Sequence, residues 1–401
     1  MRLFTELSIS EPSVVRSNEN GSSENGSSVK ELGFAVVGIV LIVVAAVVVP
    51  CALQAGEVTA ASGYSLLSPI RSGNLTVFPV VASKWYDTAE FLTLDEGLRS
   101  GEVVVTEAGQ AQGLIRRRPG DSSVIHPHPH PVRGAEVNQL VLVNNSKRPL
   151  LLLAGEIVTG GKQDRVIGKD RIVPAESDPI DLSVFCVEPG RWVAANGKNE
   201  FSAGRVQGSV FASPGVRASA MAAKNQQEVW DDVEKSKTAL AMSMPAPAAA
   251  EVNSTTSYAR VMDNKEVQRK VDAVAEPVQR NYESVIRQLR DKNAVGVVVA
   301  VNGEIVWADL FASTQLLQKY WPKLVRSYAT EAVVTRAKGG EISFKDALKF
   351  LDDLQGRHET ADSEPGVYRQ TEISGDGFKV FELRSLLPKT GFAVHVAKMA
   401  D

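Results

Sequence analysis

The chain has 401 residues, of which 44% are apolar and 23% charged, an ordinary globular composition that excludes a wholly disordered or collagen-like chain. The first 55 residues hold three of the 44 basic and five of the 47 acidic residues, so 41 basic residues face 42 acidic ones in the remainder. This near balance leaves no basic surface of the kind that nucleic acids need, and we expect no nucleic acid partner.

The first 55 residues predict a membrane segment. Residues 1–31 are polar and rich in Gly and Ser, which predicts a disordered tail. Twenty-two residues without a charge follow, from Leu32 to Leu53, and a spanning helix needs only about 18. We expect a transmembrane anchor within residues 32–55; the alternative is a signal segment cleaved after Ala55, which would give a secreted or periplasmic product.

The charges around this segment predict its orientation. Arg16 and Lys30 precede it, whereas only Arg71 follows within about 20 residues. The N-terminus is therefore expected in the cytoplasm, with everything after the cell membrane segment outside it. Of the two cysteines, Cys51 lies in the segment and Cys186 beyond it, so the later part has one thiol and no internal disulfide.

Residues 75–191 read mostly as short strands. Apolar and β-branched runs alternate with turn clusters such as residues 144–146. The runs are 103–105, 140–143, 150–158 and 182–187. Short strands at this spacing predict a mainly antiparallel sandwich or barrel-like sheet.

The second half changes to a helical period. Apolar residues at every third or fourth position predict a long helix from Val267 to Leu289, with Pro277 as a point where it kinks. Two apolar runs flank Asn302-Gly303, a pair suited to a two-residue hairpin turn. The other predictions are strands at 297–301, 305–310, 379–383 and 392–397, and helices at 218–237, 313–334 and 343–354.

Between these parts, residues 242–250 are rich in Ala, Pro and Met and predict a linker, within a flexible segment near residues 242–257. The strand-rich part has edges that the later helices can cover. We therefore expect residues 63–401 to form one composite α+β domain, in which the β half packs with the helical and hairpin half. The alternative is two domains divided at the linker.

A first polar constellation surrounds Gly160-Gly161, which predicts a hairpin turn. A two-residue turn there places Glu156 opposite Arg165, with Gln163 on the same face. We predict Glu156 as a catalytic acid or base and Lys162, Gln163 and Arg165 as ligand-binding residues for an anion. The alternative is a cross-strand ion pair on a solvent face, which contributes about 0.2–1 kcal/mol.

A second constellation follows the next strand. Pro189-Gly190 predicts a type II turn that brings Glu188 and Arg191 within about 7 Å of each other. Glu188 is predicted as the catalytic partner of Glu156, with Arg191 and Trp192 as ligand contacts, provided that the two turns converge. The alternative is a turn at the rim with Trp192 folded into the core.

Three phrases, VNQLVLVNNSKRPLLLL, AGEIVTGGKQDR and VFCVEPGRW, resemble a bacterial family, the ARG and rhodanese-phosphatase-superfamily-associated protein domain. The resemblance runs from about Leu94 to near the C-terminus. The name of the family records an association with ADP-ribosylglycohydrolases and phosphatases, which implies a ribose- or phosphate-bearing ligand. It implies no role for any individual residue.

Other features predict structure rather than chemistry. His126, His128 and His130 alternate with prolines, and polyproline II turns them in different directions, which favours a stiff exposed loop over a metal site. Cys186 alternates with apolar residues, as a buried small hydrophobe does, and His395 on the last strand is expected to be structural. No nucleotide-binding loop, HExxH or GxSxG motif occurs. The sequence therefore identifies no cofactor and leaves open whether the chain is an enzyme.

Two functions from different classes follow. The first is a domain outside the cytoplasm that binds or processes an anionic, phosphate- or ribose-bearing small molecule. The second is a non-catalytic protein-interaction module tethered to the membrane. Convergence of Glu156 and Glu188 in a concave pocket would favour the first function, whereas polar pairs satisfied by local partners would favour the second. The sequence does not specify the oligomeric state.

Overall fold

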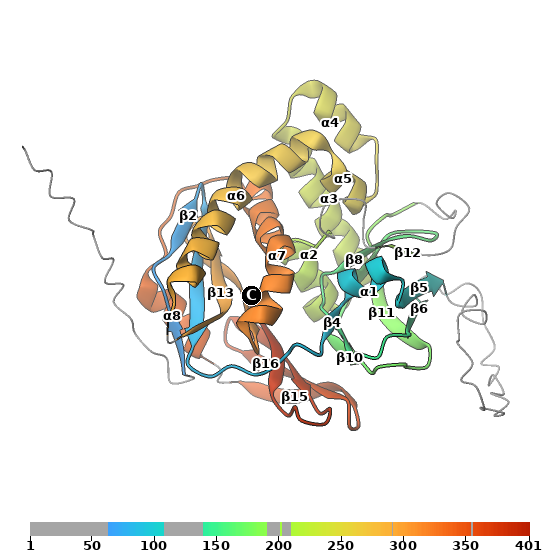
Figure 1. Ribbon diagram of the computed structural model, residues 1–401. Helices are drawn as coiled ribbons and strands as arrows, with labels where there is room; N and C mark the ends of the chain where they lie inside the picture. The colour runs from blue at the N-terminus through green and yellow to red at the C-terminus, as the bar shows by residue number, and fades with distance from the viewer. Residues whose placement is uncertain (1–62, 108–138, 191–200, 203–209, 291, 354–355) are drawn as a thin grey trace, which may run out of the picture. The chain divides into compact units, whose positions relative to one another are not determined.

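A nine-stranded antiparallel sheet is the largest element of the computed structural model, which describes residues 63–107, 139–190, 201–202, 210–290, 292–353 and 356–401 (Figure 1). Its order is β1-β3-β13-β14-β18-β17-β16-β15, with β2 paired to β3. The strands are β1 Tyr64–Leu66, β2 Ile70–Ser72, β3 Leu75–Ala82, β13 Asn293–Val301, β14 Glu304–Phe311, β15 Arg357–Glu364, β16 Tyr368–Gly375, β17 Phe378–Ser385 and β18 Ala393–Ala400. Strands from both ends of the described chain therefore share one sheet.

The predicted hairpin is confirmed as β13 and β14. Asn302 and Gly303 both have positive φ, 55° and 80°, as a type I′ turn requires. Val301 faces Glu304 across this turn. The remainder of β13 is buried almost throughout, because a central strand is covered on both faces and its run of valines and alanines suits that position.

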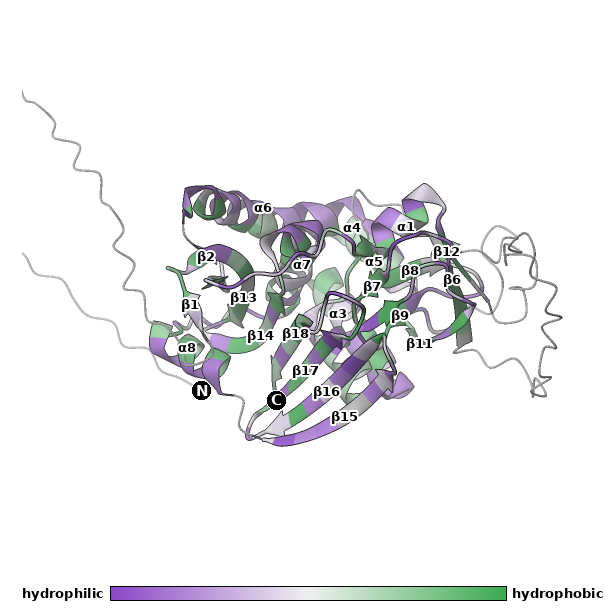
Figure 2. Ribbon diagram, turned by 60° about the horizontal axis from the view of Figure 1, so that its bottom comes forward, coloured by the Kyte–Doolittle hydropathy of each residue, from purple (hydrophilic) through white to green (hydrophobic). Residues whose placement is uncertain are grey.

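Helices cover both faces of this sheet (Figure 2). The long helices α6, Lys265–Gln288, and α7, Thr314–Val334, lie on one face, and α8, Phe344–Asp352, lies on the other. Alternate residues of β13 divide between the two layers: Val297 packs in the core with α6 and α7, and Val298 packs in the core with α8. All three helices confirm predictions made from the sequence, the one at 267–289 from its apolar spacing.

The first residue of each of these helices is fixed by a capping side chain. Ser313 accepts the N–H of Leu316 at 3.0 Å, and Ser343 accepts the N–H of Asp346 at 3.1 Å. Asn264 does the same at the start of α6. Such caps satisfy backbone donors that have no partner inside the helix, so each helix begins where the sequence offers a short polar side chain.

Two smaller sheets enclose a second core. One has six strands in the order β12-β8-β9-β11-β6-β5, and the other has three in the order β10-β7-β4. Their strands are β4 Leu92–Thr93, β5 Val103–Glu107, β6 Gln139–Asn144, β7 Leu150–Leu152, β8 Ile157–Gly160, β9 Arg165–Ile167, β10 Arg171–Val173, β11 Ile180–Cys186 and β12 Phe201–Ser202. Apolar side chains from both sheets and from helix α1, Leu94–Ser100, form one cluster. Antiparallel pairing dominates, as predicted; β4 and β7 are a parallel pair.

Short helices follow these sheets: α2 Pro214–Ala218, a π-helical turn Ser219–Ala223, α3 Gln226–Met242, α4 Ala246–Asn253 and α5 Tyr258–Asp263. The prediction of a helix at 218–237 is confirmed for residues 226–237 of α3 but is wrong as one continuous helix, because Lys224 adopts a left-handed conformation with φ 52° and separates the π-helical turn from α3. The linker prediction is wrong for its second half, where α4 begins. Whether residues 242–257 are flexible stays a prediction.

The strands β15 and β16 are absent from the sequence prediction. β15 lies at one edge of the large sheet, and Figure 2 shows it mainly hydrophilic. Ion pairs from Lys169 to Asp362 and from Arg171 to Glu364 connect this edge strand to the neighbourhood of β10. The described residues thus form a mixed α+β fold with antiparallel sheets and eight α-helices.

The predicted membrane segment and the tail before it lie outside the described residues. Within the described ranges, none of the helices combines the length and the apolar character that crossing a bilayer requires. The anchor, its orientation and the alternative of a cleaved signal therefore stay predictions.

Candidate functional site

A sharp turn interrupts the predicted strand run 150–158 and divides it into β7 and β8. At its centre Gly155 has φ 99°, a conformation that L side chains rarely adopt. A Cβ atom there would lie 2.7 Å from the Arg217 side chain and 2.8 Å from the Phe211 ring. Glycine is therefore required both for the turn and for the close approach of these two side chains.

This turn orients two carboxylates on either side of it. The N–H of Leu153 donates to Glu156 Oε2 at 2.7 Å, and the N–H of Ala154 donates to Asp170 Oδ1 at 2.8 Å. Glu156 and Asp170 are both fully buried. Each carboxylate then pairs with a different cation, Glu156 with Lys323 and Asp170 with His395.

Glu156 belongs to the Lys323 cluster, which we define as Asp95, Glu156 and Lys323. Lys323 Nζ pairs with Glu156 and lies 3.0 Å from Asp95 Oδ2. The ammonium also lies over the Tyr320 ring, 4.5 Å from its centre, and 5.6 Å from that of Phe211. Burial raises the pKa of Glu156 to about 6, with Lys323 lowering it and Asp95 raising it. One cation shared by two carboxylates leaves an excess of negative charge.

Asp170 belongs to the His395 network, which we define as Asp170, His395, Asp309, Arg217 and Tyr328. His395 Nδ1 lies 2.6 Å from Asp170 Oδ2, and Nε2 lies 3.1 Å from Asp309 Oδ1. Arg217 forms a two-pronged ion pair with Asp309, at 2.8 and 3.0 Å, and Tyr328 donates its hydroxyl to the same carboxylate. All five side chains are fully buried.

Mutual attraction keeps this network charged despite its burial. Burial lowers the pKa of His395, but the carboxylates of Asp170 and Asp309 outweigh it and raise that pKa to about 9. Burial opposes ionisation of Asp309, yet Arg217 and His395 hold its pKa well below the usual range. Two cations therefore balance two anions, and His395 donates from both ring nitrogens at neutral pH.

Neither group was found from the sequence as a site. Their members come from the turn at 154–156, the segment before β10, and the elements α1, α2, β14, β18 and α7. A local signal did exist, because Asp309 interrupts the apolar strand Trp307 to Phe311 and a charge in such a strand needs a partner. His395 was expected to be structural, and its contacts agree with that expectation.

The predicted register of the β8–β9 hairpin is wrong. Val158, rather than Glu156, faces Arg165, and Ile157 faces Val166. The reason is a longer turn: Asp164 accepts the N–H of Gly160 at 3.1 Å, which closes a wider loop than a two-residue turn. Glu156 is thereby free to pair with Lys323 in place of Arg165.

The predicted ligand residues around this loop lie largely inside the protein. Gln163 is fully buried; its amide N–H donates to the Glu188 carbonyl at 3.2 Å, and its oxygen accepts from the thiol of Cys186 at 2.9 Å. Arg165 is also fully buried and donates to the Asp164 carbonyl at 3.3 Å. Lys162 is exposed.

The two predicted turns do converge through Glu188. Its carboxylate accepts the N–H of Asp164 at 3.2 Å, and only 3% of the residue is exposed. Gly190 has φ 89°, as expected for the third position of a type II turn. Glu188 accepts the N–H of Asp164 and Glu156 accepts that of Leu153, so these two hydrogen bonds do not join the carboxylates as one pair.

Other predicted positions lie outside the described residues. These are Arg191, Trp192 and the histidines of the HPHPHP tract. Cys186 is buried as predicted, and burial raises the pKa of its thiol. Among the residues that the structure describes, no three His, Cys, Asp or Glu side chains are grouped so as to hold a metal ion.

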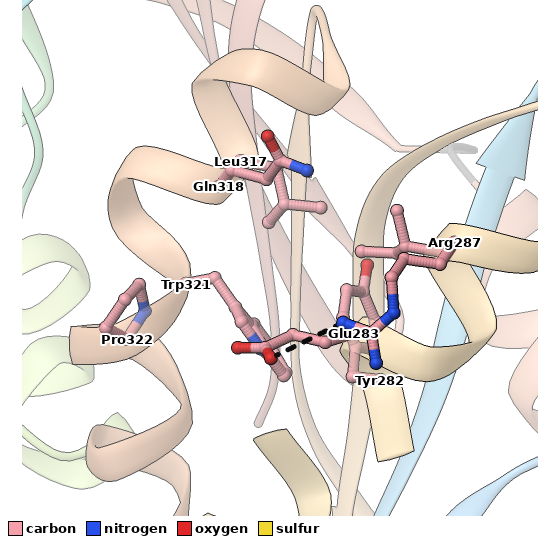
Figure 3. A pocket seen from close by; sticks show the side chains of 8 residues that line it. Tyr282, Glu283, Arg287, Leu317, Gln318, Trp321 and Pro322 are labelled. Carbon is pink, nitrogen blue, oxygen red and sulfur yellow. Dashed lines mark ion pairs between the residues drawn. The ribbon is translucent and has the colours of Figure 1, made fainter. Parts of the chain in front are cut away.

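A pocket of about 300 Å³ opens elsewhere, between α6 and α7 (Figure 3). Tyr282 and Trp321 form part of its wall and stack with ring centres 4.2 Å apart. Both rings are almost fully buried, and the Trp321 N–H makes no hydrogen bond within the described part of the chain. Ile286 and Leu317 add apolar surface.

Polar groups complete this pocket. Arg287 and Glu283 both line it, and their charged ends are 4.0 Å apart with side chains 71% and 45% exposed. Gln318 and Pro322 also contribute to the lining. Since Pro322 has no N–H, the backbone carbonyl of Gln318 loses its usual helix donor. The pocket thus combines an aromatic wall with a loosely paired cation.

The sequence model of one family matches most of the chain. It describes the ARG and Rhodanese-Phosphatase-superfamily-associated Protein domain and matches residues 63–399. The resemblance noted from three phrases is thereby confirmed, and its start moves from about Leu94 to residue 63. No curated protein and no solved structure matches this chain.

Proposed function

This chain belongs to the ARG and Rhodanese-Phosphatase-superfamily-associated Protein domain family, and from that premise we propose that it is a non-catalytic domain that binds a small anion with a flat apolar body. The membrane segment at residues 32–53 holds it at the cell membrane, with the domain outside the cytoplasm. The observation that carries the proposal is the contrast between two places: the predicted catalytic carboxylates are sealed, whereas the α6–α7 pocket is open.

The state of the two carboxylates supports a non-catalytic role. Glu156 accepts hydrogen bonds from Lys323 and from the backbone N–H of Leu153. Glu188 accepts one from the backbone N–H of Asp164. A general acid or base has to reach a proton of its substrate directly or through one water molecule. Carboxylates that are buried and hydrogen-bonded to protein groups stabilise the fold. They are poorly placed to exchange a proton with a substrate.

The α6–α7 pocket supplies what a small ligand needs. Its volume of about 300 Å³ is at the lower end for ligand sites, which are typically apolar with a few polar groups. The Tyr282–Trp321 wall suits a flat apolar body. Arg287 suits a carboxylate or phosphate, because its pairing with Glu283 is long and exposed and therefore weak.

The test is a thermal-shift screen of the full-length chain in mild detergent. The probes are phosphate, nucleotides, ADP-ribose, sugar acids, and aromatic carboxylates with matched aromatic amines. We expect aromatic carboxylates to raise the melting temperature, and Arg287→Ala to abolish that rise. Arg280→Ala is the matched control, since Arg280 forms an equivalent pair with Glu276 on α6 outside the pocket.

Two outcomes would contradict the proposal. In the first, a ligand raises the melting temperature of the wild type and of Arg287→Ala equally, but not that of Glu156→Gln; the Glu156 region would then be the binding site. In the second, a phosphate- or ribose-bearing probe is converted to product by the wild type and not by Glu156→Gln. The chain would then be an enzyme.

A further inference from the structure

Two large aromatic residues are exposed side by side in the segment between β3 and β4. Trp85 is 59% exposed and Tyr86 is 43% exposed, and Lys84 before them is also exposed. Met242 is the other large apolar residue with comparable exposure in the described part of the chain. Adjacent Trp and Tyr at a surface need an explanation, because isolated apolar residues are normal there but clusters are not.

The surrounding contacts hold this segment in place. The Tyr86 ring stacks on that of Phe392, with ring centres 4.4 Å apart. The backbone N–H of Tyr86 donates to the Ala312 carbonyl at 3.0 Å. Two residues later, Thr88 shares a hydrogen bond of 2.5 Å with Ser313. Trp85 is therefore presented outward from a braced backbone.

The pairing of β1 places these aromatics next to the start of the domain. Tyr64 is the register partner of Ala82, the last residue of β3. Trp85 follows Ala82 by three residues, which limits the separation of their Cα atoms to about 11 Å. The chain therefore enters the domain close to the exposed tryptophan.

Nine residues, 54–62, lie between Leu53, the last residue of the membrane segment predicted from the sequence, and Gly63. Nine fully extended residues span about 30 Å at most. A domain on so short a connection stays near the bilayer surface, and its entry point is the part that the connection holds closest.

Basic residues lie at the same end of the large sheet. Asn293, the first residue of β13, also pairs with Ala82, and Phe392, beneath Tyr86, immediately precedes β18. The exposed Arg290 and Lys389 belong to the segments that lead into these two strands. With Lys84 they outnumber the two exposed carboxylates of the segment between β3 and β4, Asp87 and Glu90.

We propose that the surface of Lys84, Trp85 and Tyr86 docks on the lipid headgroup region, with Trp85 inserted at the interface. Trp and Tyr are enriched at this depth of a bilayer, and Lys and Arg near it are drawn to anionic lipids. This inference rests on the membrane anchor of the proposed function. The short connection favours lipid over a second copy of the chain, because it places this surface beside the bilayer whatever the protein concentration.

The test uses the full-length chain reconstituted in vesicles of phosphatidylcholine and phosphatidylglycerol. Part of the phosphatidylcholine carries bromine near the headgroup end of its acyl chains, which quenches nearby tryptophan. We expect bromine to quench part of the wild-type emission and to quench clearly less in Trp85→Phe. Trp230→Phe, which removes a half-buried tryptophan on α3, is the control. Bromine should quench the emission of this variant by as much as it quenches that of the wild type.

The outcomes separate this inference from the proposed anchor. If carbonate extracts the chain from the vesicles, the anchor is wrong and the docking surface with it. If the chain stays in the vesicles and Trp85→Phe is quenched as much as the wild type, the anchor stands and the docking surface is wrong. A Trp85→Cys variant, in a Cys51→Ala background, that instead forms disulfide-linked dimers would assign this surface to a second copy.

Discussion

Backbone N–H groups beside Gly155 bind one carboxylate of the Lys323 cluster and one of the His395 network, and both groups are largely buried, yet they differ in charge. In the His395 network two cations meet two carboxylates, the pKa of Asp309 is lowered and His395 stays protonated. In the Lys323 cluster one cation meets two carboxylates, and burial raises the pKa of Glu156 to about 6. The difference teaches that charge balance, rather than burial alone, decides whether an interior carboxylate stays ionised.

Replacement of Arg217 should lower the free energy of unfolding the most, because it removes one of the two cations that balance the two carboxylates of the His395 network. Arg217→Met leaves Asp309 buried without its main cation, and such a loss typically destabilises by about 3–5 kcal/mol. Urea unfolding followed by fluorescence would measure the change. Arg326→Met is the control: Arg326 and Asp272 are about one third exposed, so under about 1 kcal/mol is expected. Equal losses in the two variants would mean that the network contributes little.

The pH dependence of stability should report His395 next. Its pKa is raised from 6.5 to about 9 in the folded state, so its contribution is complete below pH 6.5 and is lost as the pH rises through 9. The expected loss is about 3 kcal/mol. The difference in unfolding free energy between the wild type and His395→Gln should shrink over this range.

The comparison of the wild type with His395→Gln cancels the contributions that other titrating groups make to the pH dependence of stability. Burial lowers the pKa of Lys398 to about 8, and Lys398 alone would raise stability from pH 8 upward. The His395 imidazole can also be observed directly by NMR, where it should titrate near pH 9. Titration near 6.5 would show that the two carboxylates do not hold its proton.

The smallest effect should come from the unbalanced cluster. Since the pKa of Glu156 is raised from 4.5 to about 6, its contribution is complete below pH 4.5 and is lost as the pH rises through 6. Glu156→Gln cannot ionise, so the free energy of unfolding of the wild type should fall by about 2 kcal/mol relative to this variant across that range. A constant difference between them would contradict the raised pKa.

The same contrast explains what the sequence could and could not predict. The β13–β14 hairpin and the long helix α6 were predicted correctly, because Asn302-Gly303 and the apolar spacing are local signals, and α7 and α8 also lie where helices were predicted. The edge strand β15 was missed, since its polar residues form a strand only through pairing with β16. Its alternation carries no apolar face to recognise.

The candidate site was predicted less well for two physical reasons. The turn after Gly160 was placed too tightly, because the side chain of Asp164 widens it. The partners of Glu156 and Asp309 are remote in sequence: Lys323 is 167 positions from Glu156, and Arg217 is 92 positions from Asp309. A charge in an apolar strand signals that a partner exists, but not which residue it is.

The pairing of β3 with β13 has a consequence for how the chain acquires its structure. Beside this pair, the Asn74 amide donates to the Asn302 side chain, 228 positions later. Loops of such length must close before the contacts that reward them can form, which makes folding slow. Strand β3 is therefore synthesised long before β13, and the edge of β3 that pairs with β13 stays unpaired until most of the polypeptide has been made. Folding of this domain follows its synthesis, because a nascent chain that ends before β13 leaves one edge of β3 without its neighbour.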